Sequence, residues 1–137
     1  MFVLSGMQVV VMGLNNYAQL GLPLSKGLTF FMPELSSELV GPVGAGVALG
    51  QHHALCLSRA GLVASLGRQE YGRLGLGEDG ADATTPTAVQ DLETAVEVAC
   101  GTAVSYAITE AGDCFSWGMG TNGQLGTGKQ KLVCDCF

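Results

Sequence analysis

The sequence predicts an all-β protein, an incomplete β-propeller that holds about two to three blades. Three observations lead to this fold class. A glycine-bounded motif occurs three times, pairs of short apolar segments precede two of its copies, and the composition combines 21 glycines with only 13% charged residues. A repeated unit of about four short strands that packs against its neighbours is typical of propeller blades. A solenoid stays open as an alternative, because the period alone fits both architectures.

The recurring motif is a glycine, six further residues, a leucine and a second glycine. Its copies cover residues 13–21, 67–75 and 118–126, so they begin 54 and then 51 residues apart. Its fixed positions are Gly13, Leu20, Gly21, Gly67, Leu74, Gly75, Gly118, Leu125 and Gly126. Glycine permits a sharp reversal and a close backbone approach, and the leucine can fill the space beneath, so a structural role is expected. We call these three segments the glycine loops. The second and third glycine loops lack the signatures of phosphate-binding and dinucleotide-binding loops, which argues against nucleotide binding.

The second recurring element is a short apolar segment with a turn, bounded by glycines at both ends. It covers residues 50–61 and 101–112, again 51 residues apart. Each copy holds one strand and a turn that ends in glycine, and each leads into a second strand. The predicted strands are 54–58, 62–66, 105–109 and 113–117. Each repeat is therefore expected to be a hairpin, a glycine loop and a connecting segment.

The connecting segment after the second glycine loop is polar. Residues 78–86 include a proline and are predicted as a connecting loop, whereas the apolar residues 95–99 are predicted as a further strand. Long amphipathic helices are not expected, because few charged residues are available for a solvated helix face.

The repeat divides the chain into four parts. Residues 1–47 are read as the tail of one repeat, with its glycine loop and connector, and residues 48–98 as a complete repeat. Residues 99–128 supply the hairpin and glycine loop of the next repeat, and residues 129–137 form a C-terminal tail that matches nothing in the repeat. This organisation predicts a truncated or alternatively spliced product.

Charge and cysteine content limit the classes of partner. Six Lys and Arg residues and a formal net charge of −6 leave no basic stripe for phosphates, which argues against nucleic-acid binding by this segment. Cys56, Cys100 and Cys114 lie in apolar runs and are expected to be buried and reduced. Cys134 and Cys136 have no nearby His or further Cys pair, so no metal site is predicted. The N-terminus lacks a basic signal-peptide region and no apolar run is long enough for a bilayer, so a soluble intracellular protein without membrane contact is expected.

The glycine loops carry a family resemblance. Residues 65–77 and 117–126 resemble the repeat of the regulator of chromosome condensation family, and in particular its C-terminal-half blades. The resemblance implies a seven-bladed propeller in the nucleus that exchanges nucleotide on the small GTPase Ran. It also implies chromatin binding through nucleosomal histones and DNA, by parts of a parent protein that have no counterpart here. The resemblance implies no cofactor.

The resemblance also suggests which residues face Ran. His53 occupies the position of the histidine in the Gly-x-x-His segment of the repeat, where the family presents histidines and acidic residues to Ran, and His52 is its weaker neighbour. A structural alternative is that His53 bonds backbone groups near the channel mouth. The other repeat has Val104 at this place, which favours a functional role.

The repeat also suggests roles for a polar loop cluster and for one aromatic residue. Glu70, Tyr71 and Arg73 on the second glycine loop form a polar cluster that can face a partner, or simply a solvated loop. Trp117 is expected to pack inside a blade, because its counterpart Leu66 is apolar.

Three function classes follow from these patterns. The chain is expected to be a fragment of the Ran exchange factor, weak or inactive in isolation and compatible with the cytoplasm as well as the nucleus. The alternative is a set of protein-interaction repeats from another family member, such as a large ubiquitin ligase, without exchange activity. An enzyme with its own covalent chemistry is disfavoured, because two adjacent histidines and scattered acids build no catalytic constellation.

Overall fold

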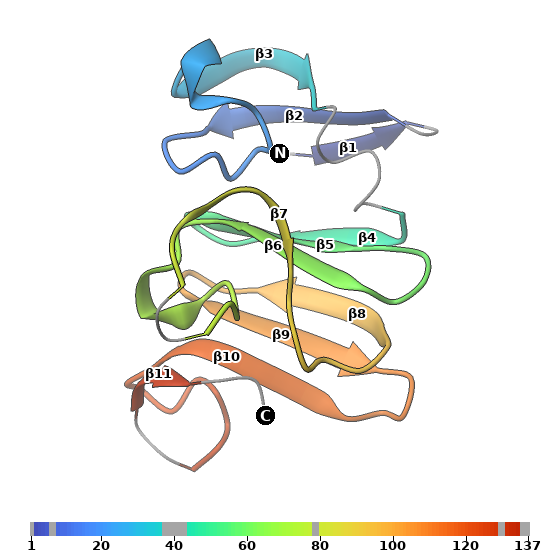
Figure 1. Cartoon of the computed structure of the whole chain (residues 1–137), viewed down its shortest axis with the longest axis vertical. Coiled ribbons are helices and arrows are strands. Elements are labelled where there is room, and N and C mark those ends of the chain that lie inside the picture. The colour runs from blue at the N-terminus through green and yellow to red at the C-terminus, as the bar shows by residue number, and fades with distance from the viewer. Residues whose placement is uncertain (1, 6–7, 37–43, 78–79, 129–130, 135–137) are drawn as a thin grey trace.

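The chain forms three small antiparallel sheets that follow one another along its long axis (Figure 1). The computed structural model describes residues 2–5, 8–36, 44–77, 80–128 and 131–134. The strands of the first sheet are β1 (Phe2–Ser5), β2 (Gln8–Leu14) and β3 (Thr29–Leu35). Those of the second sheet are β4 (Gly46–Leu49), β5 (His53–Leu57), β6 (Val63–Gly67) and β7 (Ala83–Ala88). Those of the third sheet are β8 (Ala95–Cys100), β9 (Val104–Thr109), β10 (Cys114–Gly120) and β11 (Lys131–Cys134).

The second and third sheets repeat the same pairing. His53 lies opposite Gly67 in the hairpin of β5 and β6, and Val104 lies opposite Gly118 in the hairpin of β9 and β10. The register is therefore the same after a shift of 51 residues. Each predicted strand is confirmed to within three residues at its ends. The helical elements in the described part of the chain are two single turns, η1 (Leu24–Lys26) and η2 (Glu70–Gly72).

Two strands lie in segments that the sequence analysis read as a connecting loop and as a C-terminal tail. Residues 83–88, partly within the polar connector, form β7, which pairs with β6 at the edge of the second sheet. Pro86 fits there because an edge strand has an unpaired side that does not need its N–H. Residues 131–134 form β11 at the edge of the third sheet, and Cys134 lies opposite Gly118 as Ala83 lies opposite Gly67. Both strands are held by backbone hydrogen bonds to their neighbours, so they can form without the side-chain pattern that recurs in the repeat.

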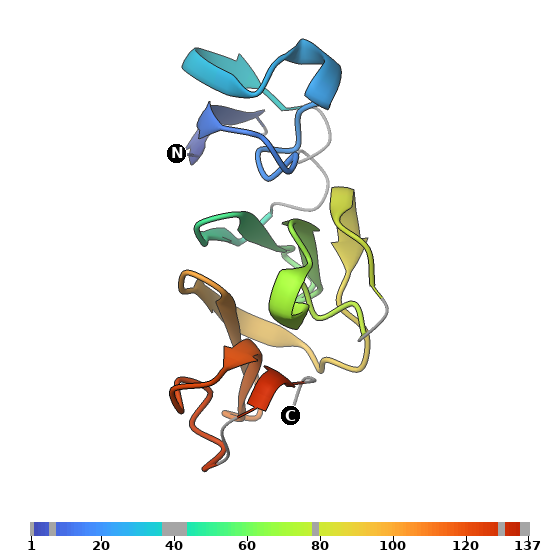
Figure 2. The same cartoon turned by 90° about the vertical axis from the view of Figure 1, so that its left-hand side faces the viewer.

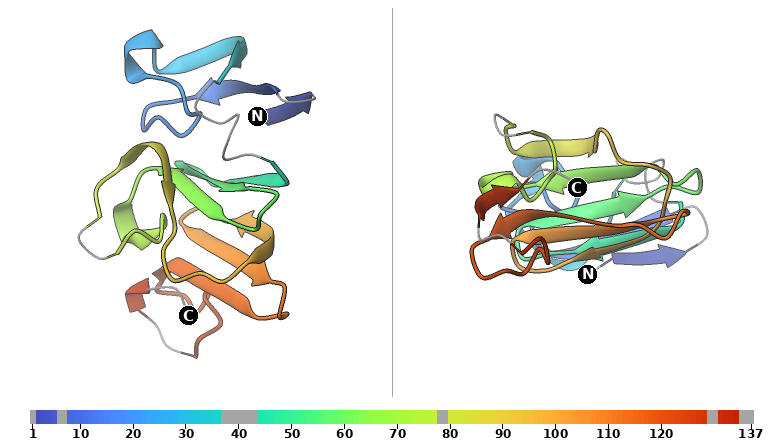
Figure 3. Two further views of the ribbon diagram at one scale, coloured as in Figure 1. Left: turned by 45° about the vertical axis from the view of Figure 1, so that its right-hand side comes forward. Right: turned by 90° about the horizontal axis from the view of Figure 1, so that it is seen from below.

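Alternation along β5 sends side chains to both neighbouring sheets. All five residues of this strand are buried, which is typical of a strand covered on both faces. Ala54 and Cys56 belong to an apolar core shared with the first sheet, whereas Leu55 and Leu57 belong to a core shared with the third sheet. The second sheet is therefore packed between the other two, as the views in Figures 2 and 3 show.

The two cores between the sheets are built from equivalent residues. Cys56, Ala64 and Leu66 of the second sheet face the first sheet. Their counterparts 51 residues later, Ala107, Phe115 and Trp117, face the second sheet. Trp117 is 0% exposed, so its predicted role in packing is confirmed.

The cysteines differ in exposure more than the sequence suggested. Cys56 is buried and Cys100 is half-buried, but Cys114 is exposed, so the expectation that it is buried was wrong. The equivalent residue, Val63, is buried because the third sheet covers it, whereas Cys114 lies on the far face of the third sheet. The remaining two cysteines, Cys134 and Cys136, have side chains outside the described residues.

Two kinds of feature are absent from the part of the chain that the structure describes. It contains no helix with the length and apolar character needed to cross a membrane. It also contains no group of three or more His, Cys, Asp or Glu side chains that can hold a metal ion.

Candidate functional site

The glycine loops gather at one end of the strands. β6 and β10 each begin after a hairpin turn, at residues 58–61 and 109–112, and each ends in a glycine loop. The loops 13–21, 67–75 and 118–126 and the β4–β5 turn at residues 50–52 therefore form one rim, which we call the glycine-loop rim. The hairpin turns lie at the opposite rim.

The first glycine of each loop has a backbone conformation that other residues rarely adopt. The φ angles of Gly13, Gly67 and Gly118 are 116°, 112° and 106°. A Cβ atom at Gly67 would lie 2.3 Å from the backbone oxygen of His52, and one at Gly118 would lie 2.4 Å from that of Ala103. The loop thus begins with a close approach between neighbouring strands, which glycine alone permits.

Side-chain amides hold the first two loops closed from inside. The Gln69 Oε1 atom accepts a hydrogen bond from the Leu74 amide at 3.1 Å, and its Nε2 donates to the Gly77 carbonyl at 2.8 Å. Asn15 makes the equivalent bonds, with the Leu20 amide and the Leu22 carbonyl, both at 3.0 Å. The leucine of the motif is buried in all three loops. The structural role predicted for the motif therefore has a direct physical basis.

His53 lies at the boundary between the second and third sheets. Its ring is 1% exposed and occupies space left by Gly50, since a Cβ there would lie 2.2 Å from the ring. Its Nε2 atom is 3.0 Å from the hydroxyl of Ser105 on β9. The Ser105 hydroxyl donates to the Arg73 carbonyl at 2.7 Å, and this carbonyl can only accept. Ser105 must then accept from His53, so the imidazole carries its proton on Nε2.

Burial sets the charge of this imidazole. Desolvation, followed by the positive charge of Arg73, lowers the pKa of His53 to about 4. His53 Nδ1 is buried, and among the described residues it has no hydrogen-bond partner. The ring is therefore neutral at physiological pH and joins two sheets, which is a structural role, although its partner is the Ser105 hydroxyl and not the expected backbone groups. In this conformation it does not lie at the surface.

His52 lies nearer the surface and joins the first two sheets. Its ring meets that of Tyr17 edge to face, with the centroids 5.2 Å apart. The Arg68 guanidinium lies over the same tyrosine, 5.0 Å from the ring centroid. Tyr17 belongs to the first glycine loop and Arg68 to the second, so these contacts link neighbouring loops along the glycine-loop rim.

The polar cluster predicted on the second loop divides into a surface part and a buried part. Glu70 is exposed and Tyr71 is half-buried, but Arg73 is only 2% exposed. Arg73 is 3.3 Å from the Glu70 carboxylate, donates through Nε to the Glu70 carbonyl at 2.7 Å, and lies over the ring of Tyr71. Glu70 also pairs with Arg68 at 3.0 Å. Arg73 therefore supports the shape of the loop from beneath, while Glu70 and Tyr71 remain accessible.

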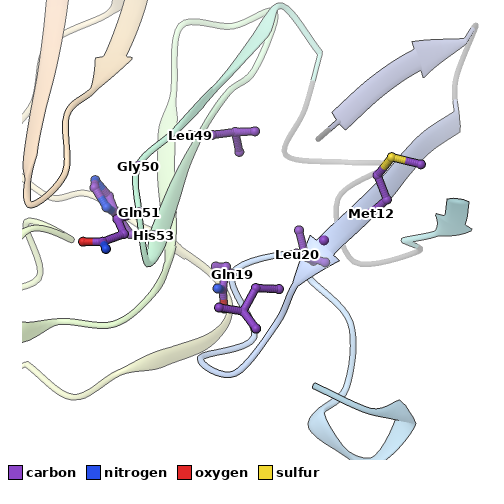
Figure 4. Close-up of a pocket in the computed structure, with 9 residues that line it drawn as sticks. Met12, Gln19, Leu20, Leu49, Gly50, Gln51 and His53 are labelled. Atoms are coloured by element: carbon purple, nitrogen blue, oxygen red, sulfur yellow. The ribbon is translucent and has the colours of Figure 1, made fainter. Parts of the chain in front are cut away.

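A cavity of about 170 Å³ lies beside this rim, between the first and second sheets. Figure 4 shows Met12, Gln19 and Leu20 on one side, and Leu49, Gly50, Gln51 and His53 on the other. Its lining combines apolar side chains with the side chains of Gln19 and Gln51, and the His53 ring bonds toward the third sheet instead. The cavity offers no charged side chain to fix a ligand.

Several serines matter to the rim although the sequence analysis did not single them out. Ser65 and Ser116 donate to the carbonyls of Leu74 and Leu125, both at 2.8 Å, and Ser105 links His53 to Arg73. Ser65 and Ser116 are 51 residues apart and each precedes its glycine by two, a signal that was available in the sequence. Ser105 has Ala54 as its counterpart, so no repeat pattern could have revealed it.

Comparison with known proteins gives consistent matches. The model of the family "Regulator of chromosome condensation (RCC1) repeat" matches residues 60–108 and 111–136. The human protein "Regulator of chromosome condensation" is 45% identical over 125 residues, which cover 87% of this chain and 28% of that protein. The human "Probable E3 ubiquitin-protein ligase HERC6" is 33% identical over 120 residues, which cover 86% of this chain and 12% of the ligase.

Solved structures agree with the sequence matches. The crystal structure of Prp20p from Saccharomyces cerevisiae, a protein described with its binding properties to Gsp1p and histones, superposes with a TM-score of 0.86 at 25% identity. The superposition covers 98% of this chain and 34% of Prp20p. The three sheets thus match blades of this propeller, and the chain spans about a third or less of the length of each of these relatives.

Proposed function

The chain belongs to the regulator of chromosome condensation (RCC1) repeat family, and we propose that its sheets are blades of a guanine nucleotide exchange factor for the small GTPase Ran. The observation that carries the proposal is the identity to the human regulator, which extends over most of this chain. The second glycine loop and the Gly-x-x-His segment lie near the middle of the chain, so an alignment that covers 87% of it must include both.

Exchange of this kind needs no covalent chemistry. An exchange factor binds the nucleotide-free GTPase more tightly than the nucleotide-bound form, and this difference in affinity lowers the barrier to nucleotide release. The relevant feature is therefore a rigid surface of defined shape. The hydrogen bonds of Gln69, Asn15 and Ser105 support the glycine-loop rim as that surface.

We assign different roles to the residues of this rim. Glu70, Tyr71 and His52 are accessible at least in part and would contact Ran directly. Arg73 and His53 lie beneath them, so they would act as positioning residues that keep the loop and the sheet boundary in place. A direct contact between His53 and Ran would require the ring to leave Ser105.

The parent protein would act in the nucleus on chromatin. Prp20p, which has the same fold, is described with its binding to Gsp1p and to histones, and this supports a GTPase and histones as partners. With only six basic residues and a net charge of −6, this chain would leave contacts with DNA to other parts of a parent protein, and we assign the histone contacts to those parts as well. The chain alone, with sheet faces open at both ends, is expected to exchange nucleotide weakly or not at all.

A chimera tests the proposal. This chain would replace the matching segment of the human regulator, and release of a fluorescent GDP analogue from Ran would be followed in stopped flow. We expect the chimera to accelerate release as the human protein does, and the isolated chain to be at least about tenfold slower, a loss of at least about 1.4 kcal/mol of transition-state stabilisation. A folded chimera without activity, or an isolated chain of full activity, would contradict the proposal.

Substitutions in the chimera then test the rim. Glu70→Ala and Tyr71→Ala are expected to slow release, whereas Glu110→Ala, on the hairpin turn at the opposite rim, serves as the matched control. His53→Ala and His53→Val are both expected to slow release in proportion to their loss of thermal stability. A large kinetic loss at unchanged stability would instead indicate that His53 contacts Ran directly.

A second function is favoured by one observation, the similarity to the ubiquitin ligase HERC6 over most of the chain. In that case the sheets are protein-interaction repeats without exchange activity. A chimera that folds, fails to bind Ran and leaves the nucleotide release rate unchanged would support this alternative.

A further inference from the structure

The far face of the third sheet carries apolar side chains that no other sheet covers within the described residues. Alternation along β9 sends Tyr106 and Ile108 away from the second sheet, because their neighbours Ser105 and Ala107 face it. Cys114 on β10 points the same way, since it lies opposite Ile108 in the hairpin. Ile108 is 38% exposed and Cys114 is exposed. We call this surface the forward face of the third sheet.

The chain itself shows what such a surface packs against. The counterparts of Tyr106, Ile108 and Cys114, 51 residues earlier, are Leu55, Leu57 and Val63. These three side chains are buried, Val63 to 4% exposure, in the core between the second and third sheets. The same positions are therefore covered wherever a further sheet follows.

A complementary surface lies at the other end of the chain. The core between the first and second sheets uses Ala64 and Leu66 on the rear side of β6. The first-sheet counterpart of Ala64, 54 residues earlier, is Val10 on β2, which is half-buried. Its neighbours Val9 and Val11 face the second sheet, so Val10 faces the opposite way. The rear face of the first sheet thus presents the kind of surface that receives a forward face.

We propose that a second copy of this chain docks head to tail, with its rear first-sheet face on the forward face of the third sheet. The contact would continue the packing that already joins the three sheets. The residues named on both faces are uncharged, and the exposed carboxylate of Glu97, opposite Ile108, lies on the edge strand β8, where it would stay at the border of the contact. Two copies joined in this way hold six sheets, within the four to eight blades of closed propellers. The inference concerns the isolated chain and does not rest on exchange activity.

Light scattering during gel filtration tests the association. Loaded at about 1 μM and about 100 μM, which bracket a micromolar Kd, the chain is expected to rise from its monomer mass of 14.1 kDa to twice that value or more. Cys114 provides a second measurement, because docking buries it. Its alkylation by iodoacetamide, followed by peptide mass spectrometry, should become about fivefold slower when about four-fifths of the forward faces are occupied. A constant mass, or a mass increase with unchanged Cys114 reactivity, would overturn the proposal.

Substitutions on the two faces test the head-to-tail geometry. Ile108→Glu should abolish association through the forward face, and Val10→Glu should abolish it through the rear face. Leu62→Glu is the control, since Leu62 is 69% exposed and its counterpart, Asp113, is already acidic. Circular dichroism would check that each variant keeps its β-structure, and Cys114→Arg replaces Ile108→Glu if that variant unfolds.

Mixing the variants separates head-to-tail docking from symmetric docking. The Ile108→Glu copy keeps an intact rear face and the Val10→Glu copy keeps an intact forward face, so their mixture should form a dimer although neither variant associates alone. Symmetric docking of two forward faces predicts instead that Val10→Glu alone still forms dimers. That result, or a mixture that stays monomeric while the parent chain associates, would refute the head-to-tail arrangement.

Discussion

The imidazole of His53 and the hydroxyl of Ser105, 52 residues apart in the sequence, join the second sheet to the third through a hydrogen bond of 3.0 Å. Ser105 passes the connection on by donating to the Arg73 carbonyl on the glycine loop. One buried serine thus links a strand end, the adjacent sheet and a loop of the glycine-loop rim. The position of the rim depends on contacts between sheets as well as on the loops themselves.

Removing the Ser105 hydroxyl should destabilise the chain strongly. Ser105→Ala leaves both the Arg73 carbonyl and the His53 Nε2–H without a partner in a buried site, which should cost about 2–4 kcal/mol of the free energy of unfolding. Ser65→Ala is the matched control, because it removes a single bond to the Leu74 carbonyl. Urea unfolding followed by Trp117 fluorescence measures both. Equal losses for the two variants would contradict a shared role for Ser105.

Acid should destabilise the fold through His53. Its pKa in the folded chain is lowered to about 4 from the ordinary value of 6.5, so protons bind the unfolded chain first. The contribution of neutral His53 to the free energy of unfolding is complete above about pH 6.5. As the pH falls toward 4, about 3 kcal/mol of this contribution is lost. Unfolding midpoints measured from pH 7 to pH 4 should show this slope. His53→Val, which introduces the residue found at this place in the other repeat, should flatten the dependence of the unfolding midpoint on pH. An unchanged slope would show that other titrating groups cause the acid destabilisation.

The glycine positions of the loops should differ in their tolerance of a methyl group. Gly123→Ala introduces only backbone strain, because φ is 75° and no atom lies within 4 Å of the added Cβ, so a loss of about 1 kcal/mol is expected. Gly67→Ala adds a clash with the His52 backbone oxygen and should cost more than about 3 kcal/mol. Thermal unfolding of the two variants measures the difference. Similar melting temperatures would show that the close approach at Gly67 is easily relieved.

Replacing Trp117 by the residue at its counterpart should leave a cavity between the second and third sheets. Trp117→Leu removes a fully buried ring and should cost about 2 kcal/mol, less than truncation to alanine. The loss is moderated because Trp117 Nε1 is buried and, among the described residues, lacks a hydrogen-bond partner. Because this is the single tryptophan, far-ultraviolet circular dichroism must follow the unfolding. A neutral effect would mean that the neighbouring sheet closes over the space.

The hairpins were predictable because their signals are local. Alternating apolar residues and turn glycines placed β5, β6, β9 and β10 to within three residues, and the period showed which positions are equivalent. The strands β7 and β11 were not predicted, since an edge strand is held by backbone hydrogen bonds to its neighbour and needs no apolar pattern of its own. Because β7 has no apolar pattern, the polar residues around Pro86 led to the prediction of a loop there.

The candidate site was only partly predictable. The sequence pointed to His53 and to the loop residues Glu70, Tyr71 and Arg73, and all four lie at or just beneath the glycine-loop rim. It did not indicate that His53 and Arg73 are buried, because their burial comes from β9 and from the packed loop. Ser105 was missed, since a serine at that position has no counterpart in the other repeat.

By itself the sequence determined the hairpin of the repeated β-unit, the positions of its glycine loops and the family resemblance, because each of these depends on residues close together in the chain. Tertiary structure alone decided which side chains face solvent and which join the sheets. The same position is buried as Val63 and exposed as Cys114, and the difference is only whether another sheet follows. Burial in a repeat protein belongs to the contact between units, which no single unit encodes.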